Sequence, residues 1–233
     1  MIRLILFDID GTLVRTADAG RRALSRAFEE LFAVTNALDG VPLAGRTDSW
    51  IVADVAAKRS LRLDDHTVER LRSAYLRYLP TELDEPGLRK GVMPGVRPLL
   101  QALSTREDAY VALLTGNFED GARIKLEYFD LWRYFASGAF GDSAHDRNTL
   151  LAEALARVRA AGGPTVDPTD VVVVGDTPLD VAVAVAAGAR SLAVATGSYD
   201  AEALRASGAD VVLDDLSDVP TVLEGLGLTA GPG

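Results

Sequence analysis

Pairs of aspartates stand directly after short apolar runs in two distant parts of this chain. The pairs are Asp8 and Asp10, after residues 2–7, and Asp176 and Asp180, after residues 171–174. Runs of this length predict strands that are buried on both faces, as in a parallel sheet. Ligands of an open parallel sheet bind at the carboxyl ends of its strands. Because four carboxylates gathered there would repel one another, the pattern predicts a metal site for an anionic substrate, and so an enzyme.

Strand patterns alternate with helical patterns through most of the chain. The strands are predicted at residues 2–7, 110–114, 171–174 and 192–195, with a weaker one at 211–213. Helical periodicity covers residues 96–103, 118–128, 149–160 and 179–187. This alternation indicates βαβ units. We therefore expect an α/β fold whose core is a Rossmann-like, doubly wound parallel sheet.

Residues 15–89 interrupt the alternation, since they carry helical patterns and no convincing strand. Three amphipathic stripes lie in this region, within residues 24–32, 51–56 and 68–79. The economical interpretation is an α-helical cap subdomain at 15–89, inserted after the first strand. The α/β core then comprises residues 1–14 and 90–233. The alternative is that these helices pack directly on the sheet.

Composition narrows the class of protein further. The formal net charge of −10 argues against binding to nucleic acid or to an anionic membrane surface. The absence of cysteine excludes disulfides and thiolate chemistry. No stretch approaches the ~20 apolar residues that cross a bilayer. We expect a cytoplasmic protein, either a monomer or a homodimer, with a small-molecule substrate.

Three short motifs carry the candidate chemistry, and each has a structural alternative. Asp8-Ile-Asp-Gly-Thr offers two carboxylates on one side of an extended chain, although a strand followed by an Asp-Gly turn is common. Thr115-Gly-Asn offers a hydroxyl and exposed N–H groups for a phosphate, or ordinary helix capping. In residues 175–180, Asp180 either reaches back toward Asp176 or complements the helix dipole.

In this order, the three motifs resemble those of the haloacid dehalogenase superfamily of phosphohydrolases, in its members with an inserted helical cap. The phosphoglycolate phosphatase and β-phosphoglucomutase branch is the most similar. The resemblance implies a Mg²⁺-dependent phosphatase of small phosphorylated metabolites. It implies that Asp8 attacks phosphorus to form an aspartyl-phosphate, and that Asp10 acts as general acid and then general base.

The same resemblance implies a metal site and a phosphate site. Mg²⁺ would be held by a carboxylate oxygen of Asp8, the main-chain carbonyl of Asp10, and Asp176, with Asp180 as a further ligand or a support. The phosphoryl group would be bound by the segment Thr115, Gly116 and Asn117.

The chain departs from the family pattern at one cation. A lysine usually precedes the last motif, and Arg147 is the only fitting cation in that stretch of this chain. Arginine keeps its charge but is bulkier than lysine. The alternative is that Arg147 is solvated, with Lys125 as a fallback whose helical position looks less suitable. His145, in the same polar loop, is interpreted as a residue without a role.

In similar proteins the loop that corresponds to residues 43–48 lies over the active site and helps to select the substrate, so the resemblance implies that Arg46 meets a carboxylate, hydroxyl or second phosphate of the substrate. Equally, Thr47 or Asp48 could cap the next helix and leave Arg46 in water.

Other functions also fit these motifs. A phosphosugar mutase would use the same core residues. A binding-only, catalytically weak family member is a further alternative, given the missing lysine. A dehalogenase would leave Asp10 and the metal-binding pair without a purpose, and a receiver-like signalling module would need only about half this length.

Overall fold

A six-stranded parallel sheet forms the core of the computed structural model, which describes residues 2–142 and 147–228. In spatial order the strands are β5 (Gly138–Ala139), β4 (Ala109–Leu114), β1 (Arg3–Phe7), β6 (Val171–Gly175), β7 (Arg190–Val194) and β8 (Val211–Leu213). The chain builds outward from β1 to β5, then returns to the other side of β1 and continues to β8. The predicted doubly wound α/β sheet is confirmed, and β1 lies at the switch point where such sheets bind ligands.

The register of β1 sets the position of the acidic motifs. Phe7 pairs with Leu113 of β4 on one side and with Val174 of β6 on the other. The amide of Asp8 then donates to the carbonyl of Val174 at 2.9 Å. Consequently Asp8 and Asp176 leave neighbouring strands at the same edge of the sheet.

Helices cover both faces of the sheet because β1 is apolar on both sides. Ile5 and Phe7 belong to one buried cluster, while Leu4 and Leu6 belong to another. The first cluster is covered by α4 (Val96–Ser104), α5 (Glu119–Tyr128) and α9 (Val219–Gly225). The second is covered by α6 (Leu150–Ala160) and α7 (Pro178–Ala187), and α8 (Ala201–Ala206) packs beside α7.

Local sequence sets the ends of α7. Pro178 occupies its first turn, and Thr177 and Asp180 form a reciprocal capping box there. Gly188 ends the helix in the left-handed region at φ +71°. Asp180 is therefore held in the first turn, on the side where β6 ends.

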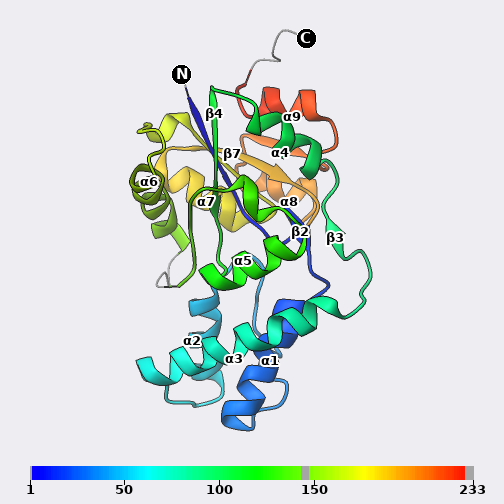
Figure 1. The fold of residues 1–233 in the computed structure, drawn as a ribbon, viewed down its shortest axis with the longest axis vertical. Coiled ribbons are helices and arrows are strands. Elements are labelled where there is room, and N and C mark those ends of the chain that lie inside the picture. The colour runs from blue at the N-terminus through cyan, green and yellow to red at the C-terminus, as the bar shows by residue number, and fades with distance from the viewer. Residues whose placement is uncertain (1, 143–146, 229–233) are drawn as a thin grey trace.

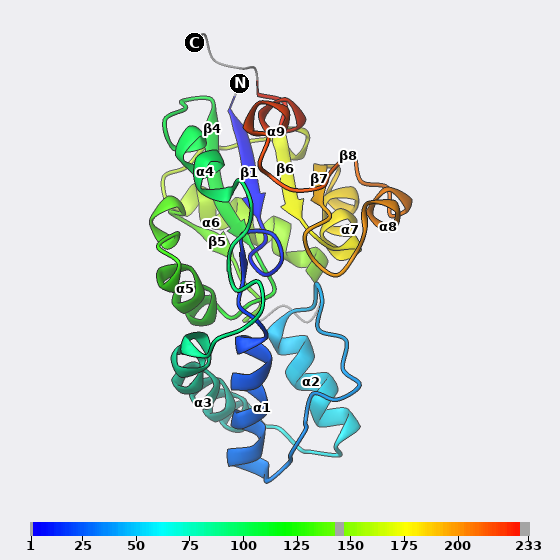
Figure 2. The same cartoon turned by 90° about the vertical axis from the view of Figure 1, so that its right-hand side faces the viewer.

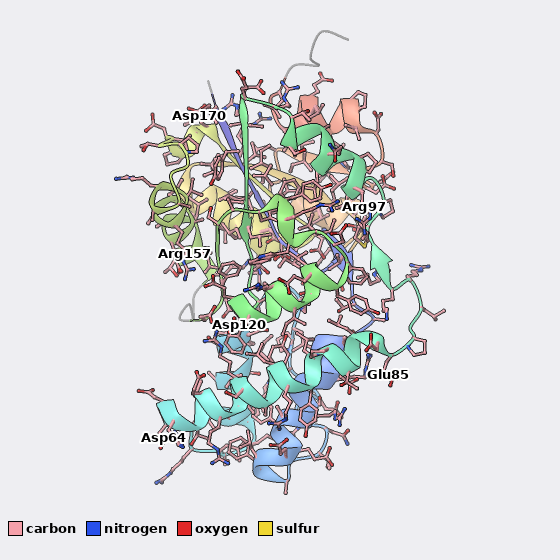
Figure 3. All side chains as sticks on the ribbon, in the orientation of Figure 1. Asp64, Glu85, Arg97, Asp120, Arg157 and Asp170 are labelled. Carbon is pink, nitrogen blue, oxygen red and sulfur yellow. The ribbon has the colours of Figure 1, made fainter. Side chains whose placement is uncertain are left out.

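Three helices form a separate layer below the sheet (Figures 1 and 2). They pack around their own buried cluster, which includes Phe28, Val55 and Leu79. Figure 3 shows the last of them crossing this layer from Asp64 at one end to Glu85 at the other. The helices are α1 (Ala19–Phe32), α2 (Asp48–Lys58) and α3 (Asp65–Asp84). The predicted helical cap is thus present, while its boundaries at residues 15 and 89 stay a prediction.

A small antiparallel pair that the sequence does not predict lies where the chain enters and leaves the cap. Val14 and Arg15 form β2 (Val14–Arg15), which pairs with β3 (Gly91–Val92). The two connections between core and cap are therefore hydrogen-bonded to each other. Among the residues that the structure describes, no helix combines the length and apolarity needed to cross a membrane.

Candidate active site

Three buried aspartates meet at the carboxyl edge of the sheet. Asp8, Asp176 and Asp180 each offer a carboxylate oxygen, and these oxygens lie within 4.8 Å of one another. Burial raises the pKa of Asp8 to about 6, against the opposing effect of Arg147. Burial, reinforced by the charges of Asp180 and Asp8, raises the pKa of Asp176 well above its ordinary value. The cluster is thus short of positive charge.

Arg147 lies against this cluster and not in solvent. Its Nη2 is 3.1 Å from Oδ1 of Asp8 and also contacts Oδ1 of Asp180. Its Nη1 donates to the carbonyl of Gly45, in the cap loop, at 2.9 Å. Burial works against the charged guanidinium, yet Asp180 and Asp8 keep the pKa of Arg147 above its ordinary value. One guanidinium therefore contacts the candidate nucleophile, the capping aspartate of α7 and the cap.

The donor set fits Mg²⁺. When all three carboxylates are ionised, they and the one guanidinium leave a charge of −2 in a buried site, which a divalent cation would balance, and Mg²⁺ prefers oxygen ligands. The side chain of Asp176 is closely surrounded by backbone. A Cβ on Gly197 would lie 1.6 Å from its Oδ2, and one on Gly11 would lie 2.4 Å away. Thr12 also donates to Oδ1 of Asp176 at 3.2 Å.

Asp10 is not part of the cluster of three buried aspartates. Its carboxylate is held by Asn117, which follows β4, and by Lys125 of α5. Its Oδ2 accepts from Nδ2 of Asn117 at 2.9 Å and from Nζ of Lys125 at 2.6 Å. The side chain of Asp10 is 43 % exposed, whereas that of Lys125 is 5 % exposed. The structure thus places Lys125 beside the candidate acid/base and Arg147 beside the candidate nucleophile.

Two of the three residues of the predicted phosphate segment line the cavity, and the third is buried behind them. Gly116 and Asn117 line the cavity, whereas the fully buried hydroxyl of Thr115 accepts from Nδ2 of Asn117 at 2.8 Å. A Cβ on Gly116 would lie 2.2 Å from the carbonyl oxygen of Arg46. Glycine is therefore required there for the cap loop to approach the core.

That cap loop is bound directly to the core. The amide of Asp48 donates to the carbonyl of Gly116 at 2.7 Å, and Oδ2 of Asp48 accepts from the amide of Phe118 at 2.8 Å. Burial raises the pKa of Asp48 to about 6, although nearby Lys125 opposes the shift. In the first turn of α5, Asp120 forms an ion pair with Arg72 of α3 at 3.0 Å (Figure 3 labels Asp120).

The capping alternative for the cap loop is confirmed, while the substrate-selecting role of Arg46 stays a prediction. Thr47 caps α2 by accepting from the amide of Trp50 at 3.1 Å. Arg46 is exposed, lines the cavity, and has its guanidinium 4.4 Å from the centre of the Trp50 ring. The cap therefore presents a cation at the cavity while its helix remains capped.

The cavity between core and cap has a volume of about 440 Å³. Its floor contains Asp8, Asp10 and Asp176, and its cations include Arg46, Lys125 and Arg147. Its roof contains apolar and aromatic cap residues, among them Leu24, Leu38, Leu43, Ile51 and Tyr75. The arrangement suits a small anionic compound whose charged end lies on the core side.

A family model for haloacid dehalogenase-like hydrolases matches residues 5–184. The chain belongs to this family. It is 30% identical to phosphoglycolate phosphatase 1 of Pseudomonas aeruginosa over 93% of this chain and 78% of that relative. It is 29% identical to the phosphoglycolate phosphatase of Rhodospirillum rubrum, over 94% of this chain and 90% of the relative. The expected hydrolase class is confirmed, and these relatives support a phosphatase.

The fold is shared with solved structures of low sequence identity. CbbY from Rhodobacter sphaeroides in complex with phosphate superposes with a TM-score of 0.70 at 22% identity, over 98% of this chain and 100% of that one. This likeness confirms the fold of this chain.

Sequence reasoning underrated two residues of the site. Lys125 was expected only as a fallback, and Asp48 only as a helix cap, yet both lie at the contact between core and cap, where Lys125 is buried and Asp48 is half-buried. Helical spacing places Lys125 on the buried face of α5 with Gly121 and Ala122, but the sequence does not show which residues that face meets. His145 lies outside the described residues.

Proposed function

We propose that the protein is a Mg²⁺-dependent phosphatase that hydrolyses small phosphorylated metabolites through an aspartyl-phosphate on Asp8. The observation that carries the proposal is the position of Asp8. The carboxylate of Asp8 belongs to the acidic cluster, contacts Arg147 and lines the cavity. Asp10, two residues further along the chain, lines the same cavity. The proposed nucleophile, the proposed acid/base and a compensating cation thus border one cavity.

The reaction would proceed in two displacements. An oxygen of Asp8 attacks phosphorus, and the bond from phosphorus to the ester oxygen breaks with its electron pair going to that oxygen. Asp10 gives its proton to the departing oxygen, which leaves as an alcohol. Water then attacks the phosphorus of the aspartyl-phosphate and gives a proton to Asp10. The bond between phosphorus and Asp8 breaks, releasing phosphate and restoring the carboxylate.

The remaining residues would stabilise charge and exclude water. When bound by Asp8, the main-chain carbonyl of Asp10, and Asp176, Mg²⁺ would supply positive charge to the phosphoryl oxygens, with Asp180 in support. Arg147 and the N–H groups of Gly116 and Asn117 would bind the same oxygens. The cap loop, already hydrogen-bonded to Gly116, would limit the access of bulk water.

The first test is turnover of 4-nitrophenyl phosphate. We expect phosphate release at a rate that falls by at least about 100-fold when Mg²⁺ is removed by a chelator and returns when Mg²⁺ is restored. Inactivity of the folded protein on a broad panel of phosphate esters would contradict the proposal. Measuring free phosphate separates hydrolysis from the mutase alternative, in which the phosphoryl group appears on a second sugar hydroxyl.

Arg46 is proposed to bind a second anionic group of the substrate, because it is an exposed cation on the cap side of the cavity. We expect Arg46→Met to raise KM about tenfold or more for phosphoglycolate, which has a carboxylate, since a charged hydrogen bond contributes about 1.5–3 kcal/mol. Turnover of 4-nitrophenyl phosphate should change less than about twofold. Arg21→Met is the matched control, because Arg21 also lines the cavity but is paired with Asp39. Equal effects of Arg46→Met on both substrates would reject this role.

A further inference from the structure

Lys125 is a buried lysine with two short contacts at the candidate acid/base. It comes from α5, is 4 % exposed, and places Nζ 2.6 Å from Oδ2 of Asp10 and 2.6 Å from Oδ1 of Asn117. Nδ2 of Asn117 completes a triangle by donating to the same oxygen of Asp10 at 2.9 Å. One oxygen of Asp10 is thus fixed by two donors that also fix each other.

The surroundings are shaped to hold this ammonium. Burying a lysine is costly unless its charge and its donors are satisfied. On the cap side, Gly20 of α1 leaves the space: a Cβ there would lie 3.3 Å from Nζ of Lys125 and 3.7 Å from the hydroxyl of Tyr75. Gly121 of α5 leaves space for the ring of Tyr75 in the same way, because a Cβ on Gly121 would lie 3.1 Å from that ring. The pocket around Nζ is therefore built by the core and the cap together.

The two buried cations of the site contact different residues. Arg147 contacts Asp8 and Asp180, whereas Lys125 contacts Asp10 and Asn117. In the proposed reaction, Arg147 would bind the phosphoryl oxygens near Asp8. Lys125 instead donates to the carboxylate of Asp10, the proposed general acid and base.

We infer that Lys125 is a positioning residue that fixes the carboxyl group of Asp10 for proton transfer; this inference rests on the proposed function. Because Oδ2 of Asp10 already accepts two hydrogen bonds, Oδ1 is the oxygen that carries the transferred proton. A half-exposed aspartate has alternative rotamers, and Lys125 with Asn117 selects one of them. Loss of Lys125 should therefore impair proton transfer to the leaving oxygen and leave the attack by Asp8 intact.

The test compares two leaving groups of similar size in Lys125→Met, which keeps the length of the side chain and removes the charge. The quantity is kcat/KM, because it reports the first displacement, in which the leaving oxygen departs. Phenyl phosphate has a poor leaving group that needs the proton, and we expect a loss of about 100-fold, the usual contribution of a positioned acid. 4-Nitrophenyl phosphate has a good leaving group, and its loss should stay below about fivefold.

Two further variants separate positioning from general damage. Lys58→Met, on the outer surface of α2, should leave both kcat/KM values unchanged. Gly20→Ala should repeat the pattern of Lys125→Met more weakly, because its Cβ presses on Nζ, while thermal stability holds or rises with the better helix former. This variant keeps the inference testable even if Lys125→Met fails to fold.

Each outcome decides the inference. A selective loss for phenyl phosphate in Lys125→Met or Gly20→Ala supports it. Equal losses for both esters, or no loss, in variants that melt like the wild type would overturn it while the wild type stays an active phosphatase. An inactive wild-type protein would overturn the proposed function and, with it, the role of Lys125.

Discussion

Replacing Asp8 by asparagine is expected to lower kcat for every phosphate ester by more than about 10⁴-fold. The carboxamide has nearly the same shape as the carboxylate but is not a nucleophile, so the aspartyl-phosphate cannot form. Incubation with substrate followed by rapid denaturation should give a phosphorylated wild-type chain by mass spectrometry and an unmodified variant. The measurement therefore tests the covalent step directly as well as the rate.

The fold should survive this substitution. Burial raises the pKa of Asp8 to about 6, so its ionised form destabilises the metal-free protein at neutral pH, and a neutral side chain removes that cost. We expect an unfolding temperature equal to or above that of the wild type in the absence of metal. Asp170→Asn is the control, because Asp170 pairs with Arg3 at the far end of the sheet (Figure 3). If Asp8→Asn kept substantial activity, the nucleophile would have to be another residue.

The sequence predicted the acidic edge because strand patterns are local. A run of buried apolar residues specifies both a strand and the place where it ends, so the positions of Asp8 and Asp176 follow once the sheet is parallel. The position of Asp180 follows from Pro178 and the first turn of a helix. The two-residue strands β2, β3 and β5 are too short to show any periodicity, and tertiary pairing alone defines them.

Lys125 could not be assigned from sequence for a different reason. Its neighbours on the helix, Gly121 and Ala122, give no sign that a charge is buried beside them. The burial results from Gly20 and Tyr75, which the cap brings from more than 45 residues away. The helical pattern fixed the face on which Lys125 lies, but only the contact between cap and core shows that this face meets Asp10.

Arg147 provides the second large effect, and it should appear in both rate and stability. Arg147→Met is expected to lower kcat/KM about 10²–10³-fold, as for the loss of one preorganised donor to a developing charge. Arg147→Lys should retain more activity but stay below the wild type. A single ammonium keeps the charge, yet it lacks the planar fork that reaches Asp8, Asp180 and Gly45 together.

Without metal, Arg147→Met should also unfold at a lower temperature, because it leaves buried carboxylates uncompensated. Removing one partner of a buried pair costs about 3–5 kcal/mol, which corresponds to about 10 °C for a chain of this size. The sign of the pH dependence follows from Asp8, which binds its proton more tightly in the folded protein than in the unfolded chain. Stability contributed by that group falls as pH rises from about 4 to about 6 and stays lower above. The deficit of Arg147→Met should therefore be larger at pH 8 than at pH 5.

Mg²⁺ then distinguishes a role in the site from simple packing. Thermal unfolding in a chelator and in excess Mg²⁺ should show a larger stabilisation of Arg147→Met than of the wild type, because the ion replaces the missing positive charge among Asp8, Asp176 and Asp180. Arg133→Met removes an exposed cation paired with Asp130 and should match the wild type in both buffers. If Arg147→Met lost stability equally at both pH values and gained nothing extra from Mg²⁺, Arg147 would be a packing residue, and the charge balance at Asp8 would depend on the metal alone.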